Sequence, residues 1–185
     1  MDYAGIMDDH AERPLKTRRE ATPREAKALA HPLRLRILRL CSVGEMTNKQ
    51  LADRLERDPG TVLYHVKQLA EAGLIEPAPV RTGESGALEK PYRSAGTTWW
   101  LDGPLNDADA VTRFGPIEAF QDELREAGPD SVQLFERFLL HLSPAEAEEL
   151  DRRILTILDE YVRTDDQRLD RPALSGIFLL HRFAG

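Results

Sequence analysis

The sequence predicts a mainly α-helical fold of the α+β class, with one small N-terminal domain followed by a second, acidic domain. Helix-capping signals recur early in the chain, a glycine-containing stretch of extended character follows them, and the charge then changes sign. Residues 13–100 carry 16 basic and 10 acidic side chains, whereas residues 101–185 carry 9 basic and 18 acidic ones. The formal net charge of -7 is therefore an average over two unlike segments.

The composition excludes several classes of protein. With 185 residues, 41% hydrophobic and 31% charged, the chain can bury a core. It has no apolar run of about 18 residues, as a membrane span needs, and residues 1–12 lack the apolar core of a signal peptide. The single cysteine, Cys41, excludes an internal disulfide and a multi-thiolate metal site. We expect a cytoplasmic protein with no membrane partner, no metal and no cofactor.

Three helices are predicted over residues 22–57. Thr22-Pro23-Arg24-Glu25 has the pattern of a capping box with proline at the first helical position, and the preceding residues 1–20 are expected to be a disordered tail. A second helix over about 33–42 carries apolar residues at i, i+4, i+7 and i+8. A third starts at Thr47. The predicted core positions of these two helices are Leu33, Ile37, Leu40, Cys41, Leu51, Ala52 and Leu55.

A fourth helix begins after a tight connection, with Asp58 as its cap and Pro59 at its first position. Its core positions are Val62, Val66 and Leu69, and Gly73 ends it. The pattern then becomes extended: a strand from Leu74-Ile75, a tip over 80–88 containing two glycines, and a return strand at 90–93. This order predicts a winged helix-turn-helix domain over residues 21–101.

Residues 102–109 are rich in turn formers and mark a boundary, so a second domain is expected over 110–185. We expect it to be α-helical or a small α/β unit that serves dimerisation or effector binding. Ile117, Phe120 and Leu124 predict an amphipathic helix, and Ser143-Pro144-Ala145-Glu146 predicts a capped helix that runs to about Val162. Residues 132–142 fit a helix and a strand equally well, and residues 173–182 are predicted as a final strand.

The predicted fourth helix, residues 59–72, can enter the major groove of DNA if the preceding helix braces it against the backbone. Its side chains offer hydroxyl, imidazole and amide groups, although His65 is expected equally often to be half-buried packing. The predicted base contacts are Pro59, Gly60, Thr61, Tyr64, His65 and Gln68. The predicted contacts of the phosphates and of the wing are Thr47, Lys49, Arg54, Arg57, Lys67, Arg81, Lys90 and Arg93.

The chain resembles the ArsR-type winged-helix repressors over about residues 24–95. The resemblance is carried by Ala28-Leu29-Ala30-His31-Pro32-Leu33-Arg34, by Thr61-Val62-Leu63-Tyr64-His65-Val66-Lys67-Gln68-Leu69 and by Ala72-Gly73-Leu74-Ile75. It implies a homodimeric DNA-binding transcriptional regulator, usually a repressor, that reads an inverted repeat in double-stranded DNA. The metal sensors of that family have a Cys-x-Cys pair where this chain has Thr47 and Lys49, so the resemblance does not extend to metal sensing.

Other functions have less support in the sequence. Trp99 and Trp100 are candidates for lining the pocket of an unidentified small-molecule effector, although adjacent tryptophans more often seal a domain junction. The acidic C-terminal half favours an alternative, in which the winged helix is a protein–protein interaction module that does not bind DNA. We expect no enzymatic activity, because no phosphate-binding loop, HExxH or GxSxG pattern is present.

Overall fold

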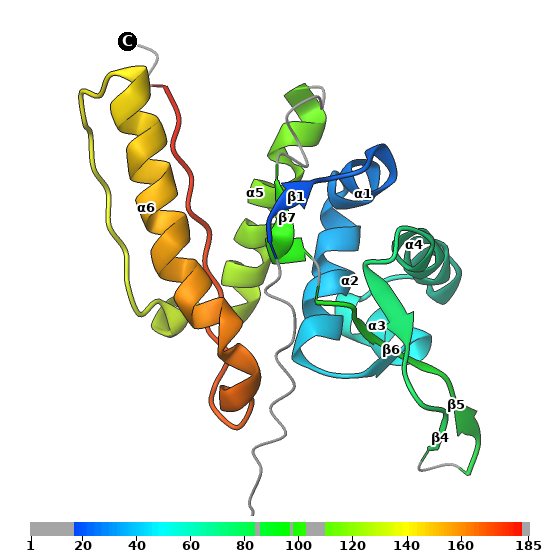
Figure 1. Cartoon of the computed structure of the whole chain (residues 1–185). Helices are drawn as coiled ribbons and strands as arrows, with labels where there is room; N and C mark the ends of the chain where they lie inside the picture. The colour runs from blue at the N-terminus through cyan, green and yellow to red at the C-terminus, as the bar shows by residue number, and fades with distance from the viewer. Residues whose placement is uncertain (1–16, 84–85, 97, 103–109, 183–185) are drawn as a thin grey trace, which may run out of the picture. The chain divides into compact units, whose positions relative to one another are not determined.

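The computed structural model describes residues 17–83, 86–96, 98–102 and 110–182 (Figure 1). Its contacts divide the chain into two compact units, Met1–Gln121 and Asp122–Gly185. The division falls inside α5 (Ala110–Ala127). Of the predicted boundary at 102–109, Asp102 belongs to the short strand β7 (Leu101–Asp102), and residues 103–109 lie outside the described residues.

The first unit contains the predicted helices, and three of them begin at the capping residues that were expected; the helix predicted over about 33–42 begins at Pro32, with His31 as its cap. Thr22 and Thr47 both form complete capping boxes, with Glu25 and Gln50 respectively, and Asp58 accepts a hydrogen bond from the Thr61 backbone N–H. These caps satisfy backbone N–H groups that the first helical turn leaves unpaired. The helices are α1 (Pro23–Leu29), α2 (Pro32–Val43), α3 (Asn48–Leu55) and α4 (Pro59–Glu71).

One apolar core joins α2, α3 and α4 to the first strand of the wing. Its fully buried members come from the predicted stripes and from the two residues after Gly73, whose φ of +70° ends the helical path. Cys41 lies in this core, and burial raises the pKa of its thiol to about 11. The core includes Ile37, Leu51, Val62, Val66, Leu69, Leu74 and Ile75.

The predicted hairpin is present and carries a third short strand on its outer side. The sheet order is β2-β6-β3, all antiparallel, and a second ladder, β4-β5, continues the hairpin toward its tip. Figure 1 shows this wing projecting away from the helices. Its strands are β2 (Met46–Thr47), β3 (Ile75–Pro77), β4 (Arg81–Thr82), β5 (Leu88–Glu89) and β6 (Pro91–Ser94).

The end of the expected disordered tail is in fact ordered. β1 (Arg19–Glu20) pairs in parallel with β7 (Leu101–Asp102), whereas residues 1–16 of the predicted tail lie outside the described residues. The guanidinium of Arg19 lies 2.6 Å from the Glu25 carboxylate. This ion pair fastens the entering chain to α1. The sequence does not predict a two-residue strand, because its partner lies about eighty residues away.

The N-terminal part of α5 packs closely on the junction between α1 and α2. A Cβ placed on Gly115 would come within 2.6 Å of the Ala30 carbonyl oxygen, so only glycine fits there without a shift. Ala119, one turn later, is buried. The first unit therefore includes the start of a helix that the sequence assigned to the second domain.

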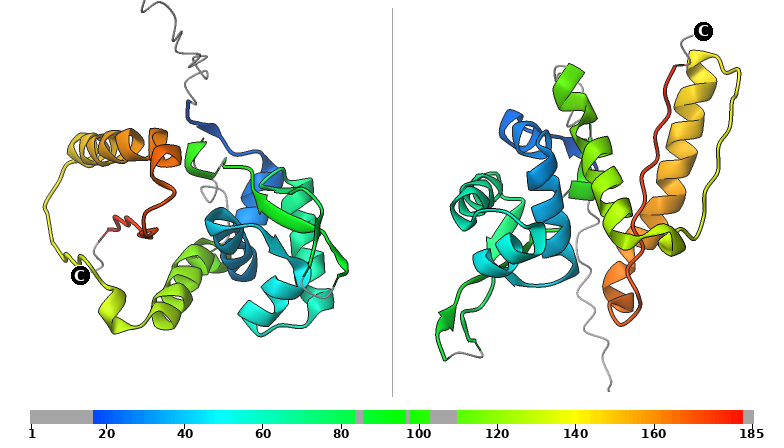
Figure 2. Two further views of the ribbon diagram at one scale, coloured as in Figure 1. Left: turned by 90° about the horizontal axis from the view of Figure 1, so that it is seen from below. Right: turned by 180° about the vertical axis from the view of Figure 1, so that it is seen from behind.

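The second unit contains one long helix and two extended segments. α6 (Pro144–Arg163) begins with the predicted capping box at Ser143 and continues to η3 (Asp165–Arg168). Residues 132–142 form neither the helix nor the strand that their pattern allows, and the predicted strand at 173–182 is likewise absent. Both are extended but have no neighbour in a hydrogen-bonded ladder, which a strand requires. Both run along α6, opposite to its direction (Figures 1 and 2).

Candidate nucleic-acid interface

The turn between α3 and α4 is fixed by hydrogen bonds from its own residues. Glu56 adopts a left-handed conformation, with φ 52° and ψ 47°, and reverses the chain. The Asn48 side-chain amide donates to the Pro59 carbonyl oxygen at 3.0 Å, which ties the start of α3 to the start of α4. Asp58 then accepts the Thr61 backbone N–H at 2.9 Å. α3 thus holds the N-terminal end of α4 in place.

The two sides of α4 have opposite characters. Its inner side, with Val62, Val66 and Leu69, is completely buried in the core. Its outer side exposes polar groups, of which the Tyr64 ring is the largest, at 58% exposed. Pro59, Gly60, Thr61 and Lys67 are exposed on this outer side as well, and Gln68 is half-buried. The amide of Gln68 donates to the Glu71 carboxylate at 3.3 Å.

His65 is the predicted base contact that the structure places elsewhere. It is only 7% exposed, and its ring lies 4.5 Å, centroid to centroid, from that of His31. Burial, together with the nearby His31 and Arg34, lowers the pKa of His65. Of the two interpretations of His65, the structure favours packing, because a ring turned toward the core does not reach a base edge.

The predicted phosphate contacts also separate into two groups. Thr47 is buried and its hydroxyl accepts the Gln50 backbone N–H at 3.2 Å, so it caps α3 instead of facing solvent. The four cationic side chains lie exposed on α3, on the turn and on α4. They are Lys49, Arg54, Arg57 and Lys67.

The wing carries less unbalanced positive charge than the sequence suggested. Arg81 lies 3.1 Å from the Glu89 carboxylate and 3.8 Å from that of Glu45, and Arg93 lies 2.8 Å from Glu76. Among the described residues, Lys90 is the predicted wing cation that forms no ion pair. Glu76 stands directly opposite Arg93 in the ladder. This pairing was not among the predictions from the sequence, although opposite charges at facing hairpin positions are a usable signal.

The two tryptophans form the short helix η1 (Thr98–Trp100), next to β7. Trp100 is buried and Trp99 is half-buried, with the Arg18 guanidinium 4.6 Å from the Trp99 ring centroid. Arg18 also lies 3.6 Å from the Asp102 carboxylate. An effector pocket at these residues stays a prediction.

The described residues hold neither a metal-binding cluster nor a membrane-spanning helix. Within the described ranges, no group of three or more histidine, cysteine or acidic side chains is arranged to hold a metal ion. No helix in the same part of the chain is both long and apolar enough to cross a membrane.

The chain is similar to known helix-turn-helix proteins. Residues 29–78 match a family model described as a helix-turn-helix domain. Comparison with curated proteins gives no significant match. Among solved structures, the chain is similar to the solution structure of a homodimeric winged helix-turn-helix DNA-binding domain from Mycobacterium bovis, titled "a possible ArsR-family transcriptional regulator". The identity is 22% and the TM-score 0.34, over 61% of this chain and 85% of the other. By its own helices, turn and hairpin, the first unit has the winged helix-turn-helix fold.

Proposed function

We propose that this protein is a transcriptional regulator that binds double-stranded DNA through α4. The observation that supports this most strongly is the division of α4 into a fully buried inner side and an exposed polar outer side that is braced by α3. An α-helix held in this way fits the major groove, where each base pair presents its own pattern of donors and acceptors.

The exposed residues suggest how affinity and specificity are divided. Thr61, Tyr64 and Gln68 offer hydroxyl and amide groups toward base edges, while Pro59 and Gly60 allow the helix end to approach closely. Contacts to bases select the sequence. The phosphate contacts come from Lys49, Arg54, Arg57 and Lys67, with Lys90 at the wing; such contacts add affinity on any sequence and weaken with salt.

We further propose that the protein acts as a homodimer and reads an inverted repeat. One α4 covers only a few base pairs, whereas two copies related by a two-fold axis place their recognition helices about 34 Å apart, one turn of DNA. A dimer bound in this way over a promoter blocks access to it, so we propose repression as its mode of regulation.

The first experiment is selection of duplexes from a random pool with the full chain, followed by titration of the selected duplex and of a scrambled one. We expect an enriched inverted repeat and a preference of at least a hundredfold for it. The alternative, a protein–protein interaction module, predicts no enriched duplex and no salt-sensitive binding.

Paired substitutions then separate the two kinds of contact. Thr61→Ala should reduce the preference for the selected duplex, whereas Arg57→Ala should weaken both duplexes and flatten the salt dependence. Arg152→Gln, in the exposed part of α6, removes one positive charge from the second unit and is the matched control. Equal losses for Arg57→Ala and Arg152→Gln would contradict the assigned phosphate contact.

A further inference from the structure

The second unit lacks a core of its own. Among its described residues, 122–182, none is buried, even though α6 and the two extended segments contain most of its large apolar side chains. A single long helix with two extended segments does not bury enough apolar surface to fold alone. The described residues of this unit therefore need a further apolar surface to complete a core.

The backbone of the two extended segments points to the same conclusion. Residues 133–142 and 172–182 form no backbone–backbone hydrogen bond within the described part of the chain. An extended segment with unpaired N–H and C=O groups is an open edge for another strand. Such edges on apolar segments are rarely left exposed, because they pair with any suitable strand.

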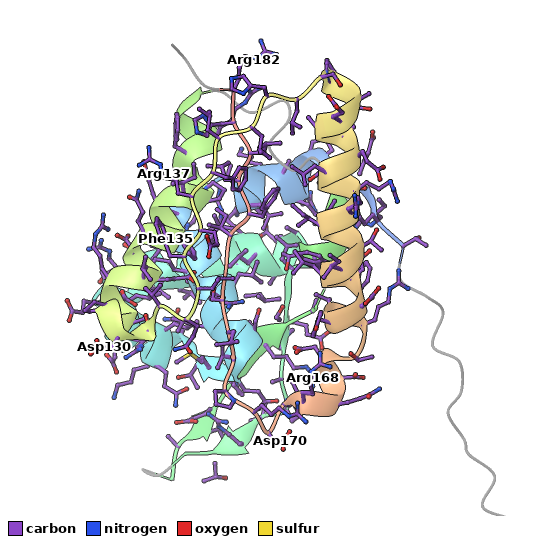
Figure 3. All side chains as sticks on the ribbon, turned by 90° about the vertical axis from the view of Figure 1, so that its left-hand side faces the viewer. Asp130, Phe135, Arg137, Arg168, Asp170 and Arg182 are labelled. Carbon is purple, nitrogen blue, oxygen red and sulfur yellow. The ribbon has the colours of Figure 1, made fainter. Side chains whose placement is uncertain are left out.

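The side chains of these segments are those of strands covered on both sides. Leu134 is 79% exposed and Phe135 is 78% exposed, and consecutive apolar residues at 134–135, 138–140 and 177–180 place apolar side chains on both sides of an extended chain. Figure 3 shows Phe135 and Arg137 on the first segment, and Arg182 at the end of the second. The other exposed apolar residues of the two segments are Phe138, Leu139, Leu140, Leu142, Leu174, Ile177, Phe178, Leu179 and Leu180.

The exposed apolar area is large enough for a stable interface. Taking roughly 150 Å² for each fully exposed large side chain, the two segments and α6 expose on the order of 1,000 Å² per chain. Two chains that cover this area bury about 2,000 Å², at the upper end of standard protein–protein interfaces. The dimensions also agree: 20 residues of α6 span about 30 Å, and 11 residues of strand span about 36 Å.

The charges favour a second copy of the same chain as the partner. Residues 132–142 carry one acid, Glu136, and one base, Arg137, so identical segments pair without net repulsion. By contrast, α6 carries six acidic and three basic side chains, so two copies meeting through its polar side would repel. A two-fold axis also pairs the open edge of this segment in one copy with the same edge in the other, since each copy supplies the same unpaired strand.

We propose that residues 132–142 of two copies pair antiparallel across a two-fold axis, with residues 173–182 as neighbouring strands. The resulting shared sheet is covered by the apolar side of α6, which includes Ile157, Leu158 and Tyr161. The inference gives the proposed homodimer its interface. It does not depend on the DNA contacts of α4, so the two are tested separately.

The first test measures the mass of the full chain in solution by light scattering and by sedimentation, without DNA. We expect a dimer, and we expect Phe138→Lys to raise its dissociation constant at least tenfold. Val43→Lys, which replaces an exposed apolar residue of α2, should leave the dimer intact. A monomeric wild-type chain, or a dimer unaffected by Phe138→Lys, would overturn the proposal. Loss of DNA selectivity by Thr61→Ala with an intact dimer would leave it standing.

The second test does not depend on a variant that weakens folding. Single cysteines are placed in turn at positions 134–140 in a Cys41→Ser chain and oxidised. Antiparallel strands related by a two-fold axis bring only one residue next to its own copy, so disulfide formation should peak sharply at one position. Uniformly low crosslinking along the segment would rule out the proposed pairing.

Discussion

The rings of His31 and His65 lie 4.5 Å apart, centroid to centroid, at an interplanar angle of 46°. His31 caps α2 by accepting the Leu33 backbone N–H on its Nδ1 at 3.2 Å, while His65 belongs to the proposed recognition helix. The Nδ1 atom of His65 is buried and forms no hydrogen bond within the described part of the chain. The contact therefore joins the start of α2 to α4 through two rings whose pKa values are lowered by burial.

This contact predicts that mild acid destabilises the first unit. Burial lowers the pKa of both imidazoles below their ordinary 6.5, and each also lies near the charge of Arg34. The unfolded chain thus takes up protons before the folded one, so stability is lost as pH falls from about 6.5 through the folded pKa values. Urea unfolding at pH 7.5 and at pH 5.5 should show a lower midpoint in acid. His65→Leu should lose much of this difference, and equal wild-type midpoints would contradict the explanation.

A second pH effect should appear at lower pH, from Glu25. Hydrogen bonds from the Arg19 guanidinium, and then from Thr22, lower the pKa of this carboxyl from 4.5 to about 2. Its contribution to stability is present above pH 4.5 and is lost as pH falls through 2. Between pH 5 and 3, wild type should lose more stability to urea than Glu25→Gln, with Arg19→Gln intermediate. A steeper loss of stability in Glu25→Gln than in wild type would contradict the lowered pKa assigned to Glu25.

The core beneath α4 should tolerate little change. Leu69 is completely buried, and Leu69→Ala should lower the free energy of unfolding by about 2–5 kcal/mol, because it removes apolar contacts and leaves a cavity. Leu88, at the wing, is 75% exposed, so Leu88→Ala should change stability by less than about 0.5 kcal/mol. Chemical denaturation of both variants measures these costs, and similar values for the two would contradict the assigned core.

The ion pairs of the wing should restrain DNA binding. Glu76→Gln frees the Arg93 guanidinium, so duplex affinity at low salt should rise several-fold, and the logarithmic salt dependence should steepen by up to about 0.9 for one additional phosphate contact. Glu148→Gln removes the same charge from an exposed position near the start of α6 and serves as the control. If both variants gain equally, the effect belongs to net charge and not to the wing.

The sequence predicted the first unit well because its signals are local. Thr22, Thr47 and Asp58 act within three residues of themselves, and the apolar stripe of α4 repeats at the helical period. Features that depend on distant partners were missed. The ion pair between Arg93 and Glu76 joins positions 17 residues apart, and β1 needs β7. Residues 132–142 have apolar positions that fit a strand, but a strand also needs a neighbour, and none pairs with them among the residues that the structure describes.

The helical period of α4 did not predict whether the His65 side chain faces the core or the solvent. It lies three residues after Val62 and one before Val66, at the border of the buried stripe, and the helical period alone leaves either side open. The ring of His31, which comes from the start of α2, decides the matter by packing against it.

If the outer side of α4 reads DNA sequence, the Tyr64 side chain should contribute to the choice between duplexes. The full chain and Tyr64→Ala are titrated against the selected duplex and against a scrambled duplex of equal length, at one salt concentration. We predict that the ratio of the two dissociation constants falls by tenfold or more in Tyr64→Ala, mainly through weaker binding of the selected duplex. An unchanged ratio, or a wild-type ratio near one, would contradict it.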